Sequence, residues 1–60
     1  MGRIIVGFKD EDEVNGERVG KVFVYEEEDP DTFLEKVRWM SFTEAQALAK
    51  ERGYDFEEEW

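Results

Sequence analysis

The fold is decided by two runs of residues, Arg3-Ile4-Ile5-Val6-Gly7-Phe8 and Val19-Gly20-Lys21-Val22-Phe23-Val24-Tyr25. Both runs are rich in β-branched and aromatic side chains, which suit the pleated surface of a strand. Between them lies Asn15-Gly16, the dipeptide that best tolerates the positive φ angles of a type I′ turn. The sequence therefore predicts that the chain begins with an antiparallel β-hairpin.

A two-residue turn at Asn15-Gly16 also predicts the register of this hairpin. Counting outward from the turn gives opposite-charge pairs and one aromatic pair across the two strands, which favour pairing. The expected partners are Val14 with Glu17, Glu13 with Arg18, Asp10 with Lys21, Phe8 with Phe23, Val6 with Tyr25, and Arg3 with Glu28. In this register one face of the hairpin carries Ile4, Val6, Phe8, Phe23 and Tyr25, and the other carries Ile5, Val22 and Val24.

The middle of the chain is less clearly patterned. Residues 26–31 are charged and contain the only proline, so we expect a loop there. Residues 33–40 fit two readings. Alternation of Phe33, Glu35, Val37 and Trp39 favours a strand, whereas Asp29-Pro30 and the spacing of Thr32 and Glu35 are typical of a helix start.

The last third predicts a helix followed by a strand. Ser41 with Glu44 three residues later forms a capping box, and Gly53 is placed to end a helix over 43–52. Phe42, Ala45, Leu48 and Ala49 would share its apolar face. The alternation in residues 54–60 predicts a strand with Tyr54, Phe56 and Trp60 on one side, which should pair in parallel with the strand before the helix. The predicted fold is α+β, a mixed sheet of three to four strands on one helix, in the order β-β-β-α-β.

Composition limits what the chain does. Its 60 residues suffice for one small acidic domain, residues 1–60, and carry a formal charge of −9. Neither cysteine nor histidine is present, so nucleophilic triads, thiol chemistry and most transition-metal sites are excluded. We expect no enzymatic activity, no cofactor and no metal. No apolar run is long enough to span a membrane, and the Glu/Lys/Arg-rich composition also fits a thermophile.

The acids concentrate in three regions: the hairpin end, the proline-containing loop and the C-terminal tail. A charge of −9 repels phosphate, so nucleic acid is excluded as a direct partner, and a basic protein surface is favoured. The main hypothesis is a cytoplasmic interaction module, an inhibitor or nucleic-acid mimic of viral or mobile-element type, that binds a nucleic-acid-handling protein. The candidate binding residues are Asp10, Glu11, Asp12, Glu13, Glu26, Glu27, Glu28, Asp29, Asp31, Glu57, Glu58, Glu59 and Trp60.

Two alternatives remain open. The first is a structural protein, natural or designed, that self-associates as a homodimer through the sheet face carrying Ile5, Val22 and Val24. The second comes from residues 40–59, MSFTEAQALAKERGYDFEEE, which resemble the helix and following strand in the N-terminal domain of bacterial translation initiation factor three. That resemblance implies a ribosome-associated domain, although a binder of ribosomal RNA should be basic.

Overall fold

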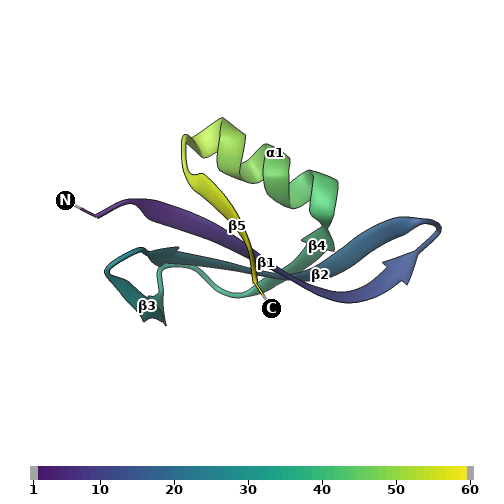
Figure 1. Ribbon diagram of the computed structural model, residues 1–60, viewed down its shortest axis with the longest axis horizontal. Helices are drawn as coiled ribbons and strands as arrows, with labels where there is room; N and C mark the ends of the chain where they lie inside the picture. Colours follow the sequence, from purple (N-terminus) through teal and green to yellow (C-terminus); the bar gives the residue numbers. More distant parts are fainter. Residues whose placement is uncertain (1, 60) are drawn as a thin grey trace.

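The structure, a computed structural model, describes residues 2–59 and confirms an α+β fold with one helix on a mixed sheet (Figure 1). The strands of this part of the chain are paired in the order β3-β2-β1-β5, and β4 also pairs with β2, beside β3. The elements are β1 (Ile4–Val14), β2 (Glu17–Glu26), β3 (Asp29–Phe33), β4 (Arg38–Ser41), α1 (Phe42–Arg52) and β5 (Asp55–Glu59).

The hairpin forms at the predicted turn. Asn15 and Gly16 have φ angles of 52° and 82°, as a type I′ turn requires. Next to the turn, Glu13 lies opposite Arg18 and Val14 opposite Glu17, as predicted. A β-bulge between Asp10 and Asp12 then inserts Glu11 into β1 and shifts the register by one residue.

Beyond the bulge the predicted register is wrong. Phe8 lies opposite Val22, Val6 opposite Val24, and Ile5 opposite Tyr25. Because side chains alternate along a strand, a shift of one residue places the side chains of β2 beyond the bulge on the opposite face from the predicted one. Val6, Phe8, Val22 and Val24 therefore form the core beneath the helix, with Ala45 and Ala49.

The shift also corrects the predicted charge pairs. Asp10 does not face Lys21, and Arg3 does not face Glu28. Arg3 instead forms ion pairs with Glu27 and Asp55. The predicted grouping of Ile5, Val22 and Val24 on one face is wrong as well, because Val22 and Val24 are buried under α1, on the opposite side of the sheet from Ile5.

Residues 33–40 form the ends of two short strands, so the strand reading is correct in part and the helix reading is wrong. β3 begins at Asp29, inside the predicted loop, and ends at Phe33, while β4 begins at Arg38. Both are antiparallel to β2. Pro30 is tolerated because β3 lies at the edge of the sheet, where a missing backbone donor costs little.

Helix α1 has the predicted caps and starts one residue early, at Phe42. The Ser41 hydroxyl accepts a hydrogen bond from the Glu44 backbone at 3.2 Å and donates one to the Glu44 carboxylate at 3.3 Å. Gly53 ends the helix with a left-handed φ of 72°. Buried Ala45 and Ala49 place the helix close to the sheet.

Strand β5 is parallel to β1 rather than paired with β4, since β4 lies beyond β2 on the far side of the sheet. Tyr54 and Phe56 pack against the core on the helix side, and Trp60 lies outside the described residues. The rings of Phe8, Phe42 and Phe56 pack together at centroid separations of 5.4 to 6.4 Å. The Arg18 guanidinium lies 4.3 Å from the centre of the Phe42 ring.

Candidate interaction surface

The sheet face opposite α1, which we call the open face, carries aromatic side chains. Register places Phe23, Tyr25 and Phe33 there, and Trp39 lies beside Lys21 on the same face. Tyr25 is almost fully buried, whereas Phe33 and Trp39 are 46% and 55% exposed. Large aromatic side chains dominate contact energies, so this exposure marks the open face as a candidate contact surface.

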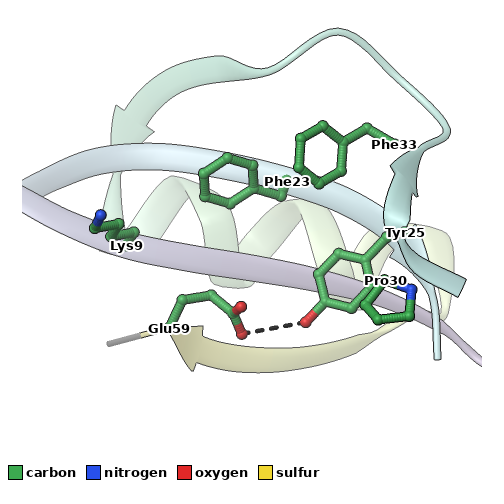
Figure 2. A pocket seen from close by; sticks show the side chains of 6 residues that line it. All are labelled: Lys9, Phe23, Tyr25, Pro30, Phe33 and Glu59. Carbon is green, nitrogen blue, oxygen red and sulfur yellow. Dashed lines mark hydrogen bonds between the residues drawn. The ribbon is translucent and has the colours of Figure 1, made fainter.

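A hollow of about 240 Å³ lies in the open face (Figure 2). Its lining combines aromatic, charged and proline side chains: Lys9, Phe23, Tyr25, Pro30, Phe33 and Glu59. We call it the aromatic hollow. The rings of Phe23 and Phe33 pack at 5.1 Å between centroids, and the Tyr25 hydroxyl donates a hydrogen bond to the Glu59 carboxylate at 3.1 Å.

Gly7 makes this hydrogen bond across the sheet possible. A Cβ at Gly7 would lie 3.1 Å from both the Tyr25 ring and the Glu59 side chain, closer than ordinary van der Waals contact. Without a side chain there, Tyr25 on β2 reaches across β1 to Glu59 on β5. Glycine in a strand often marks such a close approach.

Burial of Tyr25 and the neighbouring Glu59 charge raise the Tyr25 pKa from 10.0 to about 12. Both effects disfavour the phenolate, the first by removing it from water and the second by repulsion. The hydroxyl is therefore protonated throughout the neutral range and remains a donor to Glu59.

The predicted acidic residues do not form one patch. The hairpin end, with Asp10 to Glu13, and the β2–β3 end, with Glu26 to Asp31, lie at opposite ends of β1. The eleven residues of that strand span roughly 35 Å at about 3.3 Å per residue. The acids of β5 lie between these ends, along the sheet edge.

Several of these acids already have partners within the chain. Arg18 pairs with Asp10 at 2.9 Å and with Glu58 at 3.0 Å, and Arg3 pairs with Glu27. The contact with Arg3 holds the Glu27 pKa below its usual value. By register, Asp55, Glu57 and Glu59 share the open face with the aromatic side chains. The structure thus joins one predicted acidic region, β5, to a surface that sequence reasoning missed.

The aromatic surface was missed because its members were assigned elsewhere. The wrong register assigns Phe23 and Tyr25 to the face of Val6 and Phe8, and Phe33 and Trp39 lie in the segment that fits either a strand or a helix. Alternation in β2 shows two apolar faces, so it gives no signal for which face is covered.

Other kinds of site find no support in residues 2–59. No group of three or more Asp or Glu side chains in this range is placed to hold a metal ion. The single helix described is neither long nor apolar enough to cross a membrane. A scan against protein-family models, a search of curated proteins and a search of solved structures each find no match to this chain. The resemblance of residues 40–59 to the initiation factor domain remains a prediction.

Proposed function

We propose that this chain is a non-enzymatic protein-interaction module that binds its partner through the open face. One observation carries the proposal: Phe33 and Trp39 are about half exposed on the sheet face that α1 leaves uncovered. Exposed aromatic patches on small proteins are typical of binding sites, and buried aromatic residues are enriched among the residues that carry binding energy.

The charge of the chain indicates the partner's chemistry. The carboxylates of Asp55, Glu57 and Glu59 lie along the edge of the open face, and the whole chain carries −9. A complementary surface is apolar at its centre and basic around it. Nucleic-acid-handling proteins of the cytoplasm present such basic grooves, so we propose one of them as the partner and inhibition by occupying the groove as the activity.

The same charge favours this partner over a second copy of the chain. Two copies would bring two charges of −9 together, and a standard interface buries about 800 Å² on each side. A dimer interface of that size would cover close to a fifth of this chain's accessible surface of 4341 Å². Sedimentation equilibrium provides the check, and we expect a monomer whose mass does not change with concentration.

Binding to purified candidates tests the proposal. We would titrate the chain against an RNA polymerase core, a nuclease and a ribosome, each bound to fluorescent nucleic acid, and measure displacement. Replacing both Phe33 and Trp39 with serine should weaken binding by about 30-fold, as loss of central aromatic contacts does. Val14→Ser is the matched control, because Val14 is 48% exposed but lies at the hairpin end.

Salt dependence separates the aromatic and electrostatic contributions. Raising the salt from about 50 to about 500 mM should weaken the complex, since exposed charges are screened beyond the Debye length. The proposal is wrong if the chain displaces nucleic acid from none of these proteins, or if the double serine variant binds as tightly as Val14→Ser.

A further inference from the structure

We propose that the aromatic hollow is the anchoring site for one cationic side chain of the partner, an arginine. This inference rests on the proposed function and names the contact that orients the complex. The hollow joins a carboxylate, Glu59, to the rings of Phe23, Tyr25 and Phe33. Aromatic faces and carboxylates both attract a guanidinium, which stacks on the rings and donates hydrogen bonds to the oxygens.

The size of the hollow fits a single side chain. Pockets that enclose a small-molecule ligand measure about 300 to 1,000 Å³, and this one is about 240 Å³ and open to solvent. A cofactor or metabolite would therefore remain mostly outside it. A long, partly apolar side chain with a charged end can lie against the rings and still reach Glu59 (Figure 2).

Glu59 is held in place for this contact. The Tyr25 hydroxyl donates to Oε2 of Glu59, which fixes the carboxylate and leaves Oε1 for a second donor. Because Tyr25 is almost fully buried and packs against Gly7, this orientation does not depend on a mobile surface side chain. Preorganised groups lose less conformational entropy on binding.

The chain's own arginines are engaged elsewhere. Within residues 2–59, Glu59 forms no ion pair, whereas every arginine pairs with at least one other acid. The pairs are Arg3 with Glu27 and Asp55, Arg18 with Asp10 and Glu58, and both Arg38 and Arg52 with Glu35. Glu59 is therefore the carboxylate of the hollow that a partner's arginine meets.

Lys9 offers a second test of the arginine site, one in which binding should become stronger rather than weaker. It lies beside Glu59 in the register of β1 and β5 and lines the hollow, with its amino group turned away from the carboxylate (Figure 2). Its charge repels an incoming guanidinium. Removing that charge should therefore strengthen arginine binding, whereas removing the charge of Glu59 should weaken it.

The test uses the full chain labelled with ¹⁵N and a capped Gly-Arg-Gly peptide, with affinity measured from NMR chemical shifts. The peptide should shift the amide signals of Gly7 and Tyr25. Glu59→Gln should weaken binding about fivefold, as loss of a partly exposed charge pair does. Lys9→Gln should strengthen it about twofold. Glu51→Gln is the matched control, because it removes the same charge from an exposed position on α1, which packs on the other face of the sheet, and it should change affinity by less than about twofold.

Replacing arginine by citrulline in the peptide removes the charge but keeps the shape. The anchor is wrong if the citrulline peptide binds as tightly as the arginine peptide, or if Glu59→Gln and Glu51→Gln have equal effects. The proposed function has a separate test. It is refuted if the Phe33 and Trp39 substitutions leave partner binding unchanged. If those substitutions abolish partner binding while Glu59→Gln leaves it unchanged, the function stands and the anchor is wrong.

Discussion

Gly20 is the residue at which the register of the hairpin can be tested most directly. It lies opposite Asp10, at the β-bulge that contains Glu11, and it is buried. A Cβ at this position would lie 1.9 Å from the Lys9 carbonyl oxygen and 2.8 Å from the Lys9 carbonyl carbon. These are backbone atoms, so the clash is relieved only if the two strands move apart. We predict that Gly20→Ala is strongly destabilising.

The clash at Gly20 should reverse the usual effect of replacing glycine by alanine. In a strand interior without a clash, replacing glycine by alanine stabilises by about 0.5–1 kcal/mol, because the unfolded chain loses freedom. Forcing an extra methyl into a packed site costs about 1–3 kcal/mol, and a contact with backbone lies at the upper end. We expect a loss of about 3 kcal/mol, out of the roughly 3–9 kcal/mol that a 60-residue domain has in total.

Urea unfolding and thermal unfolding followed by circular dichroism measure this loss. A change of about 3 kcal/mol lowers Tm by roughly 12–24 °C in a domain of this size. Gly7→Ala is the comparison, because its Cβ would meet only side-chain atoms, at 3.1 Å, which can shift. Its cost should stay near 1 kcal/mol, at the low end for an overpacked site.

Deletion of Glu11 tests whether the bulge causes the close approach. Without Glu11, Asp12 opposite Val19 would directly follow Asp10 opposite Gly20, and the hairpin would be regular with its core pairs unchanged. In that background Gly20→Ala should cost less than about 1 kcal/mol, so the two changes should couple by about 2 kcal/mol. An equal cost of Gly20→Ala with and without Glu11 would refute the reasoning.

Two further predictions concern Arg18 and Tyr25. Arg18→Met should lower the urea midpoint of unfolding, because the guanidinium stacks on Phe42 and pairs with two acids. A midpoint equal to that of the parent chain would contradict this. The folded state raises the pKa of Tyr25 from 10.0 to about 12, so its contribution is complete below pH 10 and is lost as the pH rises toward 12. The free energy of unfolding of the parent chain should fall by about 2 kcal/mol over that range, and that of Tyr25→Phe should not. Unfolding measured at about pH 9 and about pH 11.5 checks this. Equal losses in both chains would exclude Tyr25 as the cause.

The parts of the fold that were predictable depend on a few adjacent residues. Asn15-Gly16 specifies its turn through two φ angles, and Ser41 and Gly53 cap the helix through hydrogen bonds within one turn. Each of these signals depends only on neighbouring residues, so the local sequence is enough to predict the turn and the caps. The end strand Asp55–Glu59 was likewise visible from alternation, although its partner was not.

The register was not predictable because both faces of β2 are apolar. With Val22 and Val24 on one side and Phe23 and Tyr25 on the other, the alternation fits a helix on either face. The choice is made by packing at a distance in sequence, where Ala45 and Ala49 bring α1 close to the sheet and leave space for valine beneath it. A bulge of one residue in a run of four acids leaves no trace in hydrophobic periodicity.

This choice of register also explains why the open face is the strongest candidate for binding. On β2 it is Val22 and Val24 that face the core, so the rings of Phe23 and Tyr25 lie on the side without a helix. Phe23 packs against Phe33 and Tyr25 is almost fully buried, yet Phe33 and Trp39 remain about half exposed. Burying the exposed rings of Phe33 and Trp39 would contribute roughly 25 cal/mol per Å² of apolar surface. In the isolated chain no other part of residues 2–59 covers them. Under the proposed function, a partner that covers the open face would gain this free energy, and the acids of β5 would favour a basic one.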